Sequence, residues 1–303
     1  MSGLKQRFFA GISALFIGVS LAMPVAAGAK VIPPTLRNDA PSFDHADTAF
    51  VSAIVIDVKS GKRLYEYKPD LRWSAASLTK LMTSMVVVDT KPNWNRIVSL
   101  TKKDNPGGGI LTLGKVSARV RMKDLLYSSI VASTNNTTIA MARATGLTTK
   151  QFVRRMNLKG KVLGLTNTTF VEPSGIDDNN MTTAADIAKI ANAAFNVPAI
   201  QRAATTPIYH FSFLNTGTKK TVKSTDNLLT KDDEFEIIGA KTGFLYNSRY
   251  NFVTRVKPVR GSSKGPELLI VVMGAPTWTS QFQTTKSLAK WAWNAYSWPS
   301  AKK

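Results

Sequence analysis

The chain of 303 residues contains no cysteine and only two histidines, His45 and His210. Without cysteine, no disulfide can staple the fold and no thiol is exposed to an oxidising environment. Two histidines provide little material for a Ser-His-Asp triad or a histidine-rich zinc site, so we interpret both as ordinary structural residues. The sequence therefore predicts neither a metal site nor a cofactor.

Acidic residues are also scarce. The chain has 19 Asp and Glu against 40 Lys and Arg, which gives a formal net charge of +21 and a pI near 10.2. So basic a surface favours a polyanionic partner. We do not expect nucleic acid, because the chain has no zinc-finger spacing, no aromatic RNA-binding motif and no concentrated basic block. We expect an anionic cell envelope instead, and a purely solubilising charge is the alternative.

Long apolar runs are absent except at the start of the chain. There, Lys5 and Arg7 precede a mostly apolar stretch from Phe8 to Val25, and small residues follow. This order predicts a secretory signal peptide over residues 1–29, with an uncleaved membrane anchor as the alternative. We therefore expect export across the cytoplasmic membrane, to the periplasm or cell envelope.

The remaining chain of about 270 residues is long enough to bury a sizeable core. Prolines in residues 30–47 favour a flexible lead-in, and we expect a short solvated tail over residues 298–303. Residues 48–297 lie between them and show no internal repeat, so we predict a single folded domain there.

Strand-like patterns occur near both ends of this region, and helical patterns fill its middle. The strand patterns are Ala49–Val58, Leu64–Tyr67, Glu236–Lys241, Tyr250–Val256 and Glu267–Met273. A late helix is expected from about Thr279 to Tyr296. This order predicts an α/β fold of the α+β kind, in which an antiparallel sheet is built from both chain ends around a helical middle region.

Three short motifs carry the chemistry: Ser77-Leu78-Thr79-Lys80, Ser133-Thr134-Asn135 and Lys241-Thr242-Gly243. Serine is a weak nucleophile at neutral pH, but a lysine one helical turn away can take its proton if the amine is uncharged. A second serine and an asparagine can relay the proton and orient a substrate amide. A Lys-Thr-Gly strand can hold a carboxylate. In this order the motifs indicate an acyl-transfer site.

The first motif has competitors, because Ser-x-x-Lys also starts at Ser2, Ser99, Ser287 and Ser300. The copy at Ser99 even repeats the four letters. Apolar residues follow Ser77 at helical spacing, which predicts that the Ser77 and Lys80 side chains share one helix face. Polar residues, a proline and three glycines follow Ser99, which indicates a loop. We therefore select Ser77.

The second motif is the only Ser-x-Asn in the chain. It interrupts helical patterns over Met122–Ala132 and Thr137–Ala144, which predicts a corner between two helices. The alternative is an ordinary helix N-cap. A rival to the third motif, Lys59-Ser60-Gly61, lies between two strand patterns and is predicted to be a hairpin turn.

Together with the runs Ala76–Thr83, Met156–Leu165 and Phe170–Gly175, these motifs resemble the serine D-alanyl-D-alanine carboxypeptidases, the low-molecular-mass penicillin-binding proteins. The resemblance covers about residues 48–296 and is strongest to short DD-endopeptidase members. It implies a β-lactamase-like fold with a catalytic domain. It also implies a penicillin-sensitive DD-peptidase that acts on peptidoglycan stem peptides, with β-lactam antibiotics as covalent inhibitors.

The resemblance implies a catalytic role for three side chains. Ser77 attacks the D-alanyl carbonyl, Lys80 is the base, and Ser133 passes the proton to the leaving amine. The backbone N–H groups of Ser77 and Phe244 form the oxyanion hole.

Substrate binding is implied for four further residues. Asn135 holds the peptide amide of the substrate. Lys241 and Thr242 bind a carboxylate on the leaving side, and Gly243 lets the substrate backbone approach the strand.

The chain departs from many relatives at Asn136, Leu245 and Ser248-Arg249, where Asp, Thr and Ala-Gly are common. These changes leave open a catalytically weak or silent wall-binding module.

A serine β-lactamase would need a further base, and Glu172 is the candidate, but it lies in a Pro-Ser-Gly turn. The motifs do not choose between carboxypeptidase and cross-link endopeptidase, because both leaving groups offer a carboxylate.

Overall fold

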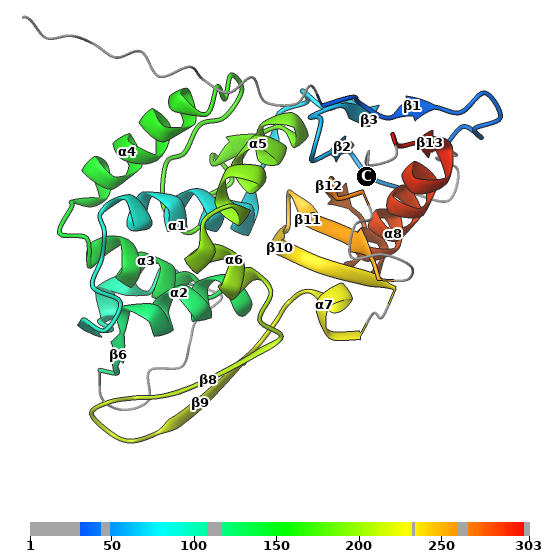
Figure 1. The fold of residues 1–303 in the computed structure, drawn as a ribbon. Coiled ribbons are helices and arrows are strands. Elements are labelled where there is room, and N and C mark those ends of the chain that lie inside the picture. Colours follow the sequence, from blue (N-terminus) through cyan, green and yellow to red (C-terminus); the bar gives the residue numbers. More distant parts are fainter. Residues whose placement is uncertain (1–30, 44–48, 108–116, 232–233, 260–265, 300–303) are drawn as a thin grey trace, which may run out of the picture. The chain divides into compact units, whose positions relative to one another are not determined.

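The computed structural model describes residues 31–43, 49–107, 117–231, 234–259 and 266–299 (Figure 1). The predicted signal peptide, His45 and residues 300–303 of the predicted tail lie outside the described residues. All elements below belong to the unit formed by residues 32–303. Among its described helices, none combines the length and the apolar character needed to cross a membrane.

A five-stranded antiparallel sheet is assembled from both ends of the chain, as the sequence predicted. In spatial order the strands are β10 (Phe235–Leu245), β11 (Arg249–Pro258), β12 (Leu268–Ala275), β2 (Ser52–Asp57) and β3 (Arg63–Tyr67). The predicted hairpin turn at Lys59-Ser60-Gly61 connects β2 to β3. Strand β10 lies at the sheet edge, so one side of it is available to other elements.

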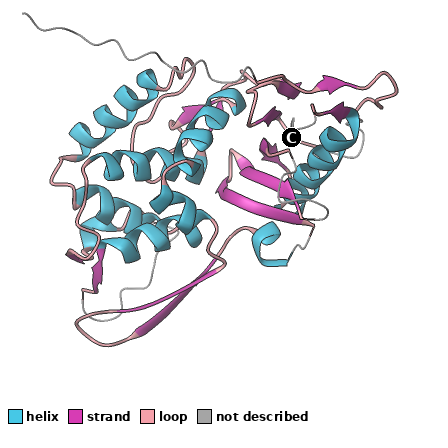
Figure 2. Ribbon diagram, in the orientation of Figure 1, coloured by secondary structure: helices cyan, strands magenta, loops and turns pink. Residues whose placement is uncertain are grey.

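Helices occupy the chain between β3 and β10 and follow β12, which confirms the predicted helical middle and late helix (Figure 2). They are η1 (Ala76–Leu78), α1 (Thr79–Asp89), η2 (Lys102–Asp104), α2 (Met122–Val131), α3 (Asn135–Arg143), α4 (Thr149–Val162), α5 (Ala184–Phe195), α6 (Pro198–Ala204), α7 (Asn227–Lys231) and α8 (Trp278–Ala295).

The sheet is covered on both faces, and β12 shows why. Successive side chains of a strand point to opposite faces. Leu269, Val271 and Met273 belong to the core shared with the helical region, whereas Leu268, Ile270 and Val272 belong to the core shared with α8. Both faces of β12 are therefore buried, which explains why the strand is apolar along its whole length. Each fully buried aliphatic side chain contributes about 1.5–3 kcal/mol to the stability of the fold.

Part of residues 30–47, which we predicted to be a flexible lead-in, contacts the C-terminal part of the chain. Strand β1 (Thr35–Leu36) pairs with β13 (Tyr296–Ser297), which follows α8. The indole N–H of Trp291 donates to the Pro41 carbonyl at 2.8 Å, and the rings of Phe43 and Trp291 pack edge to face. The aromatic side chains of the last helix thus provide a surface for this segment that proline content alone does not reveal.

Three two-stranded ribbons complete the fold. They pair β4 (Trp73–Ser74) with β7 (Met181–Thr182), β5 (Ile97–Ser99) with β6 (Arg119–Arg121), and β8 (Ile208–Ser212) with β9 (Lys219–Lys223). Ser99 ends the short strand β5, and the segment after it, for which a loop was predicted, starts with the short turn η2 at Lys102. The duplicate Ser-x-x-Lys still lacks the helical spacing of the Ser77 motif.

Candidate active site

Ser77 and Lys80 meet where the turn η1 runs directly into α1. The Lys80 Nζ atom lies 2.8 Å from the Ser77 Oγ atom. Lys80 is fully buried, whereas Ser77 keeps part of its surface exposed to a substrate. The structure thus confirms the predicted juxtaposition of these two side chains.

The Lys80 amine has two further partners, the Asn135 side-chain oxygen at 2.6 Å and the Ser174 carbonyl at 2.5 Å. Burial lowers the pKa of Lys80 from 10.5 to about 7, and the negative charge of Glu172 partly opposes this shift. A neutral amine keeps two N–H donors for Asn135 and Ser174 and has a lone pair for the Ser77 proton. This arrangement suits a general base at neutral pH.

Glu172 anchors the turn that supplies the Ser174 carbonyl. Its carboxylate accepts hydrogen bonds from the Ser174 N–H and hydroxyl, each at 2.6 Å, and from the Ile176 N–H at 3.0 Å. The Gly175 N–H and the Asn180 amide also donate to it. Because these bonds direct the Glu172 carboxylate toward groups of its own loop, a structural role fits Glu172 better than that of a β-lactamase base.

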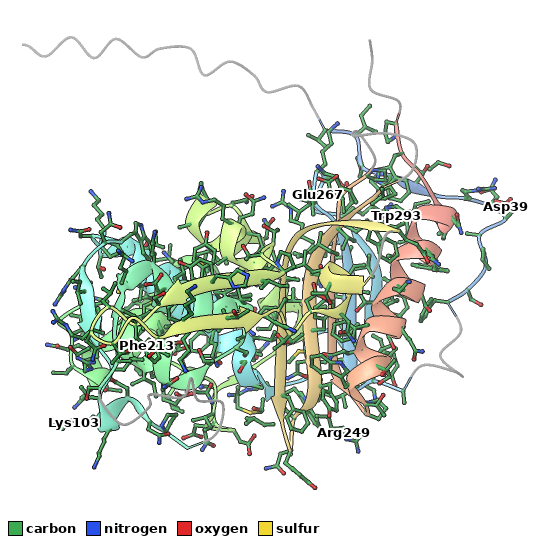
Figure 3. The ribbon with its side chains drawn as sticks, turned by 90° about the horizontal axis from the view of Figure 1, so that it is seen from below. Asp39, Lys103, Phe213, Arg249, Glu267 and Trp293 are labelled. Atoms are coloured by element: carbon green, nitrogen blue, oxygen red, sulfur yellow. The ribbon has the colours of Figure 1, made fainter. Side chains whose placement is uncertain are left out.

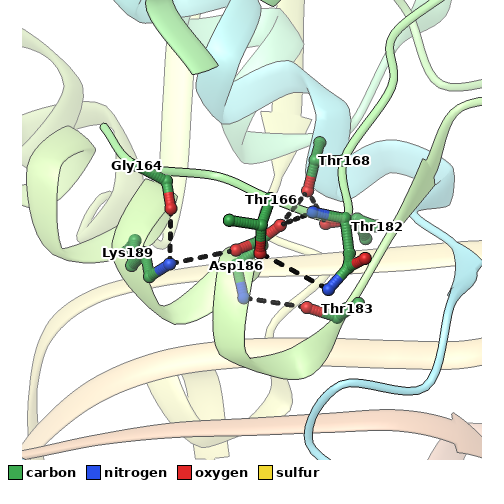
Figure 4. A network of polar contacts seen from close by, with 8 residues as sticks. Gly164, Thr166, Thr168, Thr182, Thr183, Asp186 and Lys189 are labelled. Carbon is green, nitrogen blue, oxygen red and sulfur yellow. Dashed lines mark hydrogen bonds and ion pairs between the residues drawn. The ribbon is translucent and has the colours of Figure 1, made fainter. Parts of the chain in front are cut away.

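Asp186, in the first turn of α5, holds the residues that lead into this turn (Figure 4). The buried Asp186 carboxylate accepts from the Asn167 N–H at 2.9 Å, from the Thr168 hydroxyl at 2.8 Å and from the Lys189 ammonium at 3.2 Å. The Thr183 hydroxyl in turn accepts from the Asp186 N–H and caps the helix. These contacts hold the loop of Ser174 in register with the helical region.

Ser133 lies at the predicted corner between α2 and α3. Its φ angle is +55°, a strained left-handed conformation for a residue with a Cβ. The N-cap of α3 is Thr134, whose side chain makes no capping bond, so the alternative of an ordinary N-cap does not explain Ser133. Its hydroxyl instead accepts from Lys241 Nζ at 2.8 Å, which joins the second motif to the third.

Lys241 and Thr242 are buried on the edge strand β10. Burial and the nearby charge of Lys80 lower the pKa of Lys241 well below its usual value, while Asp226 acts in the opposite direction. A carboxylate bound beside Lys241 would stabilise its charged form. The Thr242 hydroxyl lies 2.6 Å from that of Thr225, a contact that none of the three motifs indicates.

Strand geometry places the Phe244 N–H on the free edge of β10. The next N–H, that of Leu245, bonds to the Ser248 hydroxyl on the hairpin side at 3.0 Å. Successive N–H groups of a strand point in opposite directions across it, so the Phe244 N–H points away from β11. A Cβ added to Gly243 would lie 3.2 Å from the Ala75 carbonyl oxygen, so this strand packs closely on the turn of Ser77.

The hairpin of β10 and β11 is paired through Leu245 and Arg249, two of the positions where we expect the chain to depart from many relatives. Arg249 has a φ of +54°, the left-handed conformation that glycine adopts most readily, at the position where many relatives have glycine. The Ser248 carbonyl accepts the Trp73 indole N–H at 2.8 Å. Asn136 is fully buried in the first turn of α3. These changes therefore leave the three motifs assembled.

Other catalytic schemes find little support in the described part of the chain. It contains no group of three His, Cys, Asp or Glu side chains that could hold a metal ion. His210 is exposed on the ribbon β8–β9, where its Nδ1 atom is 2.9 Å from the Thr221 hydroxyl. A serine activated by a buried lysine is the arrangement that these residues form.

The antiparallel sheet, the helical region and the three converging motifs define a serine-lysine acyl-transfer enzyme. The chain belongs to the Peptidase S11 family, described as D-alanyl-D-alanine carboxypeptidase, whose pattern matches residues 39–277. This confirms the resemblance found from the motifs.

Individual relatives agree with this assignment. The D-alanyl-D-alanine endopeptidase of Escherichia coli (strain K12) is 29% identical over 92% of this chain and 87% of its own length. The protein of the same name from Pseudomonas aeruginosa is 28% identical over 91% and 86%. The Streptomyces K15 DD-transpeptidase superposes with a TM-score of 0.74 at 24% identity, covering 84% of this chain and 99% of that one. Penicillin binding protein 5 from Haemophilus influenzae gives 0.71 at 28%, covering 86% and 72%. The predicted fold class is confirmed.

Proposed function

We propose that this protein is a serine DD-peptidase that hydrolyses D-alanyl bonds in peptidoglycan stem peptides through an acyl-enzyme on Ser77. The observation that carries the proposal is the 2.8 Å approach of the Ser77 hydroxyl to a fully buried Lys80 whose pKa is lowered to about 7. The remaining motifs converge on the same place through the Asn135–Lys80 and Ser133–Lys241 contacts.

The reaction begins when neutral Lys80 takes the Ser77 proton and Ser77 Oγ attacks the D-alanyl carbonyl carbon. Negative charge develops on the carbonyl oxygen, and the N–H groups of Ser77 and Phe244 stabilise it, by roughly 3 kcal/mol per donor. Ser133 then gives its hydroxyl proton to the leaving nitrogen and is reprotonated by the Lys80 ammonium, and the C–N bond breaks. Water attacks the resulting ester while neutral Lys80 takes one of its protons, the bond between the acyl carbon and Ser77 Oγ breaks, and Lys80 returns that proton to Ser77.

Substrate orientation follows from β10. A carboxylate of the leaving portion binds at Lys241 and Thr242, and the acylated carbonyl lies beside the Phe244 N–H. Asn135 is held by Lys80 and presents its side-chain amide to the substrate backbone. Because β-lactams mimic an acylating amide next to a carboxylate, we expect penicillins to acylate Ser77.

Cross-linked peptides are the substrates that we propose. The relatives from Escherichia coli and Pseudomonas aeruginosa, which align with about nine-tenths of this chain, are both named D-alanyl-D-alanine endopeptidase. This name supports cleavage of cross-links, while removal of terminal D-alanine from pentapeptide uses the same groups.

We further propose that the protein acts outside the cytoplasmic membrane, in the periplasm or cell envelope, and that its positive charge holds it near an anionic wall. The leader-like residues 1–29 and the formal charge of +21 support these two proposals.

The direct test supplies purified enzyme with cross-linked muropeptide dimers and with monomeric pentapeptide, and reads the products by mass spectrometry. We expect dimers to be converted to monomers, and the Ser77→Ala variant to leave both substrates intact. Release of D-alanine from pentapeptide with untouched dimers would replace the endopeptidase by a carboxypeptidase. If neither substrate is cleaved while penicillin still binds normally, the protein is a catalytically silent wall-binding module.

A further inference from the structure

The ribbon formed by β8 and β9 has one face packed against α2. The Tyr209 ring stacks on Tyr127 with 4.2 Å between centroids, and its hydroxyl donates to Asp124 at 2.7 Å. Val222, directly opposite Tyr209, is buried. On the same side of β9, the Lys220 ammonium lies 4.9 Å from the centre of the Phe213 ring. Figure 3 labels Phe213 at this ribbon. These contacts fix the ribbon to the helical region.

The opposite face of the ribbon is exposed and cationic. Side chains alternate along a strand, so Lys219, Thr221 and Lys223 share this face, and all three are exposed. No Asp or Glu occurs between Asp186 and Asp226 in the sequence. Within the described parts of the chain, neither Lys219 nor Lys223 forms a salt bridge. The two ammonium groups are therefore available to an anionic partner.

The base of the ribbon lies at the carboxylate end of the active site. Two residues after Lys223, the Thr225 hydroxyl is 2.6 Å from that of Thr242, and the Thr225 N–H donates to the Val131 carbonyl at 3.1 Å. An extended chain advances about 3.4 Å per residue. The Cα of Lys223 is then within about 7 Å of Thr225, and that of Lys219 within about 20 Å.

The leaving groups of the two candidate reactions differ in whether they are long enough to reach Lys219 and Lys223. In a carboxypeptidase reaction the leaving group is one alanine, whose carboxylate is taken by Lys241 and Thr242. In a cross-link it is a diamino acid that carries its own stem peptide, with several carboxylates spread over an extended chain. A peptide of a few residues spans the distance from Thr242 to Lys219, the lysine farther from the active site.

We propose that the exposed face of β8–β9 is a subsite for the leaving-side stem peptide, in which Lys219 and Lys223 pair with its carboxylates. This inference rests on the proposed DD-peptidase function and deepens it, because the subsite favours cross-linked substrate over pentapeptide. The two lysines are specificity-determining residues, and they take no part in bond cleavage.

The test compares the double variant Lys219→Gln/Lys223→Gln with Lys220→Gln, which removes one charge from the opposite face of the same strand. We expect the double variant to lower kcat/KM for a cross-linked dimer about tenfold, mainly through KM, since exposed ion pairs are individually weak. Its activity on pentapeptide and its rate of acylation by fluorescent penicillin should stay within about twofold of wild type. Lys220→Gln should leave the ratio of the two activities unchanged.

Binding of the same dimer to the Ser77→Ala protein, measured by calorimetry with and without the double substitution, separates this inference from the proposed reaction. Weaker binding with the double substitution supports the subsite even if the wild-type enzyme proves to cleave pentapeptide only. Equal binding, or an equal loss of activity on dimer and pentapeptide, would overturn it.

Discussion

Gly175 lies so close to Ala76 that a Cβ on Gly175 would stand 1.9 Å from the Ala76 carbonyl oxygen. The glycine also has a φ of +83°, which residues with a Cβ rarely adopt. This contact presses the loop that supplies the Ser174 carbonyl against the turn that carries Ser77. The environment of Lys80 and the position of Ser77 are therefore coupled through one glycine.

Replacing this glycine should damage both stability and acylation. Gly175→Ala must displace either the loop or the Ser77 turn, and we expect it to lower the free energy of unfolding by roughly 2–4 kcal/mol. Gly146 is a matched control, because it has the same φ of +83° but nothing within 4 Å of an added Cβ. Gly146→Ala should cost about 1–2 kcal/mol and leave penicillin acylation intact. Equal effects of the two substitutions, measured by urea unfolding and acylation rate, would contradict the coupling.

The buried Lys80 should make stability depend on pH in a defined window. Its pKa is about 7 in the folded protein and 10.5 when unperturbed. Below pH 7 Lys80 is charged in the folded protein, and the full cost of burying that charge lowers the free energy of unfolding. Between pH 7 and 10.5 the folded amine is neutral while the unfolded one stays protonated, so stability from this group rises with pH.

We therefore expect wild type to gain stability relative to the Lys80→Met variant as pH increases from 7 to 9, by roughly 2 kcal/mol, since a full proton difference is worth about 1.4 kcal/mol per pH unit. Urea unfolding of both proteins at several pH values measures this difference. Parallel pH curves would show that the lysine titrates alike in both states.

The same lowered pKa predicts how the proposed reaction depends on pH. Acylation needs neutral Lys80, so the acylation rate should increase with pH through about 7 and level off above it. Lys80→Arg keeps a cation that is not deprotonated in proteins, and this variant should not be acylated at any pH between 6 and 9. Acylation of that variant at a rate near wild type would remove Lys80 from the role of base.

Much of the site could be predicted from sequence because it depends on side-chain types at short spacings. The Ser77 and Lys80 pair follows from helical periodicity, and the corner of Ser133 follows from the break between two helical patterns. The sheet could be predicted because its apolar strands occur near both chain ends. These features are local, or they depend on one repeated pattern.

Other features depend on contacts between distant segments and on backbone atoms. The run Phe170–Gly175 contributes to the family resemblance, but it does not indicate that the Ser174 carbonyl lies beside Lys80, because any residue carries a carbonyl. The Thr225 contact with Thr242 needs the packing of the ribbon base against β10. The order of residues 34–43 depends on aromatic surface from α8, more than 240 residues later in the chain. Only the folded chain brings these groups together.

Net charge gives a prediction about the proposed envelope association. Binding of the protein to isolated sacculi should weaken steeply with added salt, because the screening length falls from about 8 Å at physiological ionic strength to about 3 Å at 1 M. Hydrolysis of a small soluble peptide is the control and should change much less. Binding to sacculi that does not respond to salt would exclude an electrostatic role for the basic surface.

The central claim, that Ser77 is the nucleophile of an acyl-transfer site, is tested most directly by locating a penicillin adduct. Wild type and the variants Ser77→Ala and Ser99→Ala are incubated with penicillin, and intact mass and peptide mapping determine the number and position of adducts. We predict one adduct, on Ser77, in wild type and in Ser99→Ala, and none in Ser77→Ala. An adduct that persists in Ser77→Ala, or that is lost in Ser99→Ala, would contradict the claim.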